Sequence, residues 1–295
     1  MSPGRLLRAL LERTLEEGLP PPVALMRLLL AAAAPGEVER ALAAAAPTTA
    51  RRARQVETLR ALLDANPQAW HVVKAVQARL PAPLSRSGGT AAVRRWAAAF
   101  DDLAGVSPDA AAALYALGNP ALLRAATAEV AGRMRRWGLL GRDRRLAEIG
   151  CGTGRFEEAL AGEAAAILGL DVSAAMLAVA RRRCASLANV AFVLTSGADL
   201  APLPDDSIDL LFAVDSFPYI VDAGPALVAR HFAEAGRVVR HGGELLIFNF
   251  SYRNDPVADR EEVLGRGEAA GFAALRLGSR DLERWDGITF RLRRR

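Results

Sequence analysis

Apolar residues recur at three- and four-residue spacing through the first 135 residues of the chain, as in Val56, Leu59, Leu62 and Leu63. This spacing places apolar side chains on one face of a helix. Residues that favour helix starts precede several of these stretches, at Pro35-Gly36-Glu37, Asn66-Pro67, Ser107-Pro108 and Asn119-Pro120. The pattern predicts seven or eight helices and almost no strand in this region.

The pattern changes after residue 140, where short apolar runs alternate with helical stretches. The runs cover residues 146–149, 165–170, 190–195, 208–214 and 244–250. Such runs, separated by helices, are typical of a parallel sheet covered on both faces. Two later runs, 273–277 and 288–292, lie close together and predict an antiparallel pair. We therefore expect an α/β fold: a doubly wound, mostly parallel, seven-stranded Rossmann-like sheet with an antiparallel last strand, behind an all-α N-terminal region.

A segment rich in Pro, Ser and Gly, residues 81–90, has the composition of a linker. We predict a helical cap or dimerisation region over 1–80, the linker and lid helices over 81–135, and the sheet domain over 136–295. The first region could be a dimerisation arm, a substrate cap or a partner-docking module. A homodimer through its helices is one of these alternatives.

Composition narrows the classes of function. The formal net charge is +5, but Lys74 is the only lysine, and the arginines alternate with acids as on solvated helix faces. We therefore do not expect nucleic acid as a partner. Two distant cysteines and three scattered histidines suggest neither a disulfide framework nor a metal site. The longest apolar run, 23–34, contains Arg27 and is too short to span a bilayer. A cytoplasmic protein without membrane contact is expected.

The stretch 146–156, LAEIGCGTGRF, predicts a strand, a glycine turn and a helix. Glycine allows a ligand to approach the backbone closely and allows positive φ. The dinucleotide pattern G-x-G-x-x-G would need a third glycine at Arg155 or Glu157, so it does not match. An acid, Glu148, precedes the first glycine and is placed to receive a cationic ligand group. That arrangement suits an amino-acid tail better than a pyrophosphate.

The next predicted strand ends in Asp171. A carboxylate at the tip of this strand is placed to accept both hydroxyls of a ribose. The alternative is that Asp171 caps the helix beginning near Ser173.

Four motifs in series, EIGCGTG at 148–154, LDVSAAM at 170–176, GADL at 197–200 with LPDDSIDLLFAVDS at 203–216, and AGRVVRHGG at 235–243, resemble the class I S-adenosylmethionine (SAM)-dependent methyltransferase family over about residues 120–295. The resemblance implies SAM as cofactor, S-adenosylhomocysteine as product, and no metal. It also implies positions for the cofactor: the turn residues Gly150, Cys151, Gly152 and Gly154 beside it, Glu148 beneath its amino-acid part, Asp171 on the ribose, Val172 and Met176 flanking the adenine, Ala198 and Asp199 at the adenine edge, and Val214 on the methyl-donor side.

The acceptor is expected after the fourth and fifth strands. Asp215 and Tyr219 are candidates to bind or deprotonate it, although both could equally be structural. Further candidates near the acceptor or in a lid are Phe100, Tyr115, Ser216, Phe217, Asn249 and Tyr252. The run 216–219, SFPY, lacks the N/D-P-P-Y/F signature of amide and base-amine methylation.

The resulting hypothesis is methyl transfer by in-line displacement to an N or O atom of a small-molecule acceptor. Two alternatives are an RNA or protein methyltransferase and a non-catalytic SAM-binding scaffold with a helical partner-binding arm. A dehydrogenase is a remote fourth option.

Overall fold

The computed structural model describes residues 3–81 and 88–295; residues 82–87 of the predicted linker lie outside this part. The described chain forms two compact units. The first comprises residues up to 80 together with 106–129 and 282–286, and the second comprises 81–105, 130–281 and 287–295. These units do not follow the three predicted ranges one for one: the range 81–135 is divided between them, and residues 282–286 belong to the first unit.

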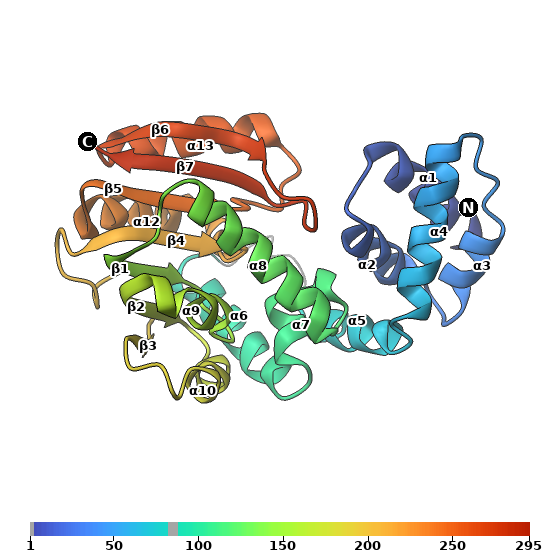
Figure 1. The fold of residues 1–295 in the computed structure, drawn as a ribbon, viewed down its shortest axis with the longest axis horizontal. Helices are drawn as coiled ribbons and strands as arrows, with labels where there is room; N and C mark the ends of the chain where they lie inside the picture. Colours follow the sequence, from blue (N-terminus) through green and yellow to red (C-terminus); the bar gives the residue numbers. More distant parts are fainter. Residues whose placement is uncertain (1–2, 82–87) are drawn as a thin grey trace. The chain divides into compact units, whose positions relative to one another are not determined.

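The helices (Figure 1) begin close to the residues that were expected to start helices. In the order of the chain, they are α1 (Pro3–Glu17), α2 (Pro21–Ala31), α3 (Glu37–Ala43), α4 (Ala50–Asp64), α5 (Ala69–Gln77), α6 (Thr90–Ala104), α7 (Pro108–Ala112), the 3-10 helix η1 (Leu114–Ala116), α8 (Pro120–Arg136), α9 (Arg155–Leu160), the 3-10 helix η2 (Ala161–Glu163), α10 (Ala174–Arg183), α11 (Phe217–Asp222), α12 (Pro225–Val238) and α13 (Pro256–Ala269). The predicted all-helical N-terminal region is confirmed.

Two asparagines with similar predicted roles behave differently. Asn119 caps α8, because its Oδ1 accepts the backbone N–H of Ala121 at 2.8 Å. Asn66 does not cap α5; it donates to the Leu62 carbonyl at 2.7 Å, and its Oδ1 accepts from Asn119 at 2.7 Å. The hydrogen bond between the two asparagines therefore joins the end of α4 to the start of α8 within the first unit.

The strands form one seven-stranded sheet, as predicted, and its strand order is β3-β2-β1-β4-β5-β7-β6. Their bounds are Gly141–Ile149 (β1), Ala164–Asp171 (β2), Val190–Leu194 (β3), Ile208–Val214 (β4), Val239–Phe248 (β5), Phe272–Arg280 (β6) and Ile288–Arg294 (β7). Strands β1 to β5 pair in parallel, and β7 pairs antiparallel with both β5 and β6. The carboxyl ends of β1, β2, β4 and β5 therefore share one edge of the sheet.

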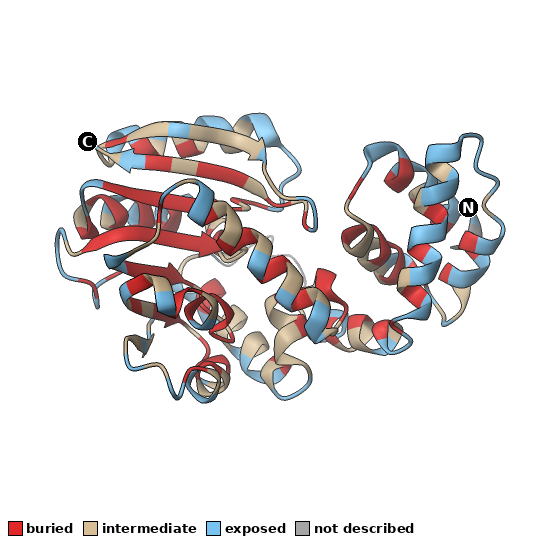
Figure 2. Cartoon of the chain, in the orientation of Figure 1, coloured by how far each residue is buried: buried red, intermediate tan, exposed pale blue. Residues whose placement is uncertain are grey.

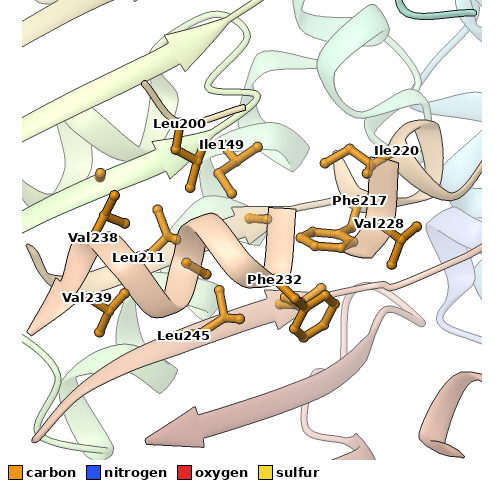
Figure 3. Packing of buried hydrophobic residues seen from close by; sticks show 14 of the residues in the cluster. Ile149, Leu200, Leu211, Phe217, Ile220, Val228, Phe232, Val238, Val239 and Leu245 are labelled. Atoms are coloured by element: carbon orange, nitrogen blue, oxygen red, sulfur yellow. The ribbon is translucent and has the colours of Figure 1, made fainter. Parts of the chain in front are cut away.

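Burial is greatest on the central strands (Figure 2). Every residue of β4 is buried, because helices cover both faces of the sheet. On one face, Leu211 and Leu245 of β4 and β5 pack with Val228 and Phe232 of α12 (Figure 3). On the other face, Phe156 of α9 contacts Phe212 edge-on, with ring centroids 6.3 Å apart. This packing stabilises the strand ends that carry the candidate site.

The first unit has its own small core. Leu25 of α2, Leu42 of α3 and Val73 of α5 are fully buried in it. Tyr115 stacks on Trp285 with ring centroids 5.5 Å apart, so the segment between β6 and β7 is anchored by an aromatic contact. In the described part of the chain, no helix combines the length and apolar character needed to cross a membrane.

Candidate functional site

The glycine turn follows β1 directly, and all three of its glycines have positive φ. The values are 72° at Gly150, 52° at Gly152 and 73° at Gly154, a region that residues with a Cβ enter only at a cost. Space is restricted as well: a Cβ on Gly150 would lie 2.4 Å from that of Ser216. The turn therefore requires glycine for its conformation and for its contact with the segment after β4.

The turn is tied to the end of β2. The backbone N–H groups of Gly150 and Cys151 both donate to the Leu170 carbonyl, at 2.7 and 3.0 Å. The N–H of Gly152 donates to Oδ2 of Asp171 at 2.8 Å. Asp171 thus positions the turn, in addition to any role in holding a ribose.

Asp171 does not cap the next helix with its side chain. Ser173 does, because its Oγ accepts the N–H of Met176 at 3.1 Å. The second oxygen of Asp171, Oδ1, accepts the N–H of Ser173 at 2.8 Å. Burial raises the pKa of Asp171, while the N–H donors of Ser173 and Gly152 act against that rise. Each carboxylate oxygen can accept a further hydrogen bond, so two ribose hydroxyls remain compatible with this geometry.

Glu148 is 1 % exposed and lies beneath the turn. Burial, and then the neighbouring carboxyl of Glu157, hold its pKa well above the usual range. Its Oε2 accepts no hydrogen bond from the described residues. An orphaned buried oxygen of this kind is compatible with a cationic ligand group above the turn.

The predicted adenine side is assembled partly by helix α6. A Cβ on Gly197 would lie 2.7 Å from methyl groups of both Val172 and Val93. Asp101 of α6 accepts from Ser173 Oγ at 2.6 Å, which joins α6 to the start of α10. Asp199 already has a partner, since its Oδ2 forms an ion pair with Arg230 at 2.9 Å. Met176 is buried in the first turn of α10.

The acceptor candidates after β4 and β5 converge on one carboxylate. Oδ1 of Asp215 accepts from Asn249 Nδ2 at 2.7 Å and from Tyr252 OH at 2.9 Å. Asp215 and Asn249 have φ values of 60° and 67°. Such left-handed residues outside glycine cost energy and are found preferentially at functional sites.

Aromatic rings lie next to this carboxylate; we call Trp96, Phe100, Tyr219 and Tyr252 the aromatic cluster. Tyr219 lies at its centre, with ring centroids 4.6 Å from Trp96, 5.2 Å from Phe100 and 6.1 Å from Tyr252. Burial, and then the charge of Asp215, raise the pKa of Tyr219. Its hydroxyl therefore stays protonated at neutral pH and can donate a hydrogen bond but cannot act as a base.

Three other candidate residues have structural contacts of their own. Phe217 is 1 % exposed and packs between Phe232 and Phe250. Ser216 donates its hydroxyl hydrogen to the Ile149 carbonyl. Tyr115 belongs to the first unit, where Trp285 covers its ring.

Two residues near the candidate site, Trp96 and Glu157, were not predicted from the sequence. Trp96 lies four residues before Phe100, and this spacing places both rings on one face of a helix. Glu157 stands next to Glu158, and the sequence does not distinguish the buried acid from the exposed one. Ala198 lies in the loop between β3 and β4, and Val214 is the last residue of β4. Within residues 3–81 and 88–295, no three His, Cys, Asp or Glu side chains form a group that could hold a metal ion.

Part of the sheet domain is similar to known proteins. A family model described as a methyltransferase domain matches residues 147–247. The demethylmenaquinone methyltransferase of Tropheryma whipplei, found in strains Twist and TW08/27, is 34% identical over 105 residues. That alignment covers 36% of this chain and 41% of the relative, so the chain spans less than half the length of the curated relatives it matches.

Two solved structures are similar at low identity. A SAM-dependent methyltransferase from Aquifex aeolicus is 20% identical with a TM-score of 0.45, over 59% of this chain and 92% of that one. Phosphoethanolamine N-methyltransferase 1 from Haemonchus contortus is 18% identical with a TM-score of 0.46, over 53% and 32%. The family match, the sheet order and the glycine turn together identify residues 147–247 as a class I SAM-dependent methyltransferase domain.

Proposed function

We propose that the protein transfers a methyl group from SAM to an N or O atom of a small-molecule acceptor. One observation carries the proposal: Glu148, Asp171 and Asp215 stand at the carboxyl ends of the neighbouring strands β1, β2 and β4, on the shared edge of the sheet. Ligands of open α/β sheets bind outside this edge. The relatives' name, demethylmenaquinone methyltransferase, designates a small-molecule acceptor and supports the same class.

The cofactor would supply a methyl group made electrophilic by its sulfonium. Glu148 would face the amino-acid part, Asp171 would bind the ribose hydroxyls, and Val172 would pack on the adenine. The reaction needs a nucleophile held in line with the methyl group and shielded from water. The aromatic cluster offers apolar surface for an acceptor, and Trp96 is held in place because its Nε1 donates to Asp222 at 2.9 Å.

Asp215 is the residue we propose for the proton of an acceptor that arrives protonated. Its carboxylate is oriented by Asn249 and Tyr252, so its position is defined before the acceptor binds. Tyr219 and Tyr252 would act as hydrogen-bond donors to the acceptor or to Asp215.

Calorimetry with SAM and with NAD tests the cofactor, and incubation of metabolite pools with methyl-labelled SAM tests turnover. We expect SAM to bind, NAD not to bind, and label to appear in a small molecule. Binding of NAD without SAM would refute the cofactor assignment. Binding of SAM with no labelled product from any pool, or with label only in RNA or protein, would refute the acceptor class.

A further inference from the structure

A second buried acid lies beside Glu148. Glu157 of α9 is 0 % exposed and points at β2: a Cβ on Gly169 would lie 2.8 Å from its Oε1. Gly169 is the residue of β2 that pairs with Glu148 of β1. The missing side chain at position 169 therefore leaves room for the Glu157 carboxyl next to that of Glu148.

Three of the four carboxyl oxygens of this pair lack a hydrogen-bond partner among the described residues. Neither oxygen of Glu157, nor Oε2 of Glu148, has a hydrogen-bond partner in the described structure. The carboxyl of Glu157 is close enough to that of Glu148 to raise its pKa. Two adjacent ionised carboxylates with so few donors are costly to bury, whereas a proton between them satisfies both.

The surrounding charges do not remove the need for a proton. The backbone N–H of Glu157 favours ionisation of its own side chain, and Arg155 of α9 favours ionisation of both acids, whereas Asp171 of β2 opposes it. The Cys151 thiol in the turn and the Cys184 thiol after α10 are uncharged neighbours, since burial raises the pKa of each. Burial raises the pKa of Glu157 to about 7, and Glu148 shifts in the same direction.

We propose that Glu157 is a positioning residue for the cofactor: it shares a proton with Glu148 in the free protein, and the pair gives up that proton to solvent when SAM binds. The inference rests on the proposed function, which brings the cationic amino-acid part of SAM to the Glu148 side of the turn. A nearby cation favours the ionised form of a carboxyl, so bound SAM lowers the proton affinity of the pair. The proton bound to the carboxyl pair passes to the buffer, and the pair becomes the counter-charge of the ligand.

Calorimetry of SAM binding in buffers of different ionisation enthalpy measures this proton directly. The wild-type protein should release between about half a proton and one proton per SAM at pH 7. Its dissociation constant should fall as the pH rises from 6 to 7, by up to about tenfold, because protons compete with the ligand. Over this range the α-ammonium of SAM itself stays mostly protonated.

The variant Glu157→Gln keeps the shape and supplies a permanent N–H donor to Glu148, so SAM binding should release fewer protons than in the wild type and depend less on pH. Glu158→Gln is the matched control: it makes the same substitution one residue later, at a side chain that is 56% exposed, and should behave as the wild type.

Two results overturn the inference while leaving the proposed function intact: tight SAM binding to the wild type without proton release, or undiminished proton release in Glu157→Gln. Absence of SAM binding to the wild-type protein would overturn both. Proton release by the wild-type protein tests the inference even if the variant fails to fold.

Discussion

Asn249 donates a 2.7 Å hydrogen bond from its side-chain amide to the carboxylate of Asp215, and both residues have left-handed backbone conformations. They stand directly after β5 and β4, two adjacent parallel strands. The paired strand ends therefore hold two side chains in one geometry at the proposed acceptor side.

The orienting role of Asn249 can be separated from its backbone conformation. Asn249→Gly retains the positive φ but loses the amide, so we expect activity to fall about tenfold, as for loss of a hydrogen bond to a charged group, with little change in stability. Asn249→Ala should lose the same activity and also about 1 kcal/mol of stability, because alanine disfavours this conformation. Methyl-transfer rates and urea denaturation measure the two effects. Full activity in Asn249→Gly would show that Asp215 needs no such partner.

Asp171→Asn should weaken SAM binding by about ten- to a hundredfold. The change removes a charged acceptor from the ribose and turns an N–H2 group toward the N–H of Gly152 or Ser173, each now bonded at 2.8 Å. Titration calorimetry with SAM measures the loss. Asp206→Asn serves as the control, because Asp206 lies in an exposed turn with φ 48°, which asparagine adopts readily. Equal affinity of the Asp171 variant and the wild type would contradict the ribose assignment.

Gly150→Ala should destabilise the protein by about 2 kcal/mol or more and abolish SAM binding. The new methyl group would meet Ser216 at 2.4 Å in a backbone conformation with φ 72°. Gly162→Ala, where a Cβ meets nothing within 4 Å, should leave both properties unchanged. Thermal melts with and without SAM test the pair, and a Gly150 variant that binds SAM normally would refute the requirement for glycine.

The buried Glu157 should make stability depend on pH. Its folded-state pKa of about 7 exceeds its ordinary value of 4.5, so the folded protein holds the proton more tightly than the unfolded chain. The stabilisation is complete below pH 4.5 and is lost as the pH rises through 7. The difference corresponds to about 3 kcal/mol at 1.36 kcal/mol per pKa unit.

Urea denaturation from pH 5 to 8 measures this effect. The free energy of unfolding of Glu157→Gln, relative to the wild type, should increase by about this amount across the range. Glu158→Gln should stay parallel to the wild type. Parallel curves for all three proteins would mean that Glu157 is ionised at neutral pH in the folded state.

The sequence by itself determined the elements and their order. Alternating apolar runs and helical stretches must bury a sheet on both faces, and a chain with runs such as 208–214 has few other ways to remove them from water. Three glycines behind an acid restrict the turn in the same local way. These properties depend on neighbours along the chain, so they are readable without coordinates.

Only the tertiary structure decided which side chains meet. The contact of Glu157 with Glu148 depends on the pairing of β1 with β2, which places Gly169 beside Glu148. The meeting of Trp96 with Tyr219 joins residues of α6 and α11. Burial of one acid and exposure of the next, at 157 and 158, follows from the packing of α9 on the sheet. Contacts between residues distant in sequence are set by packing, and no local pattern records them.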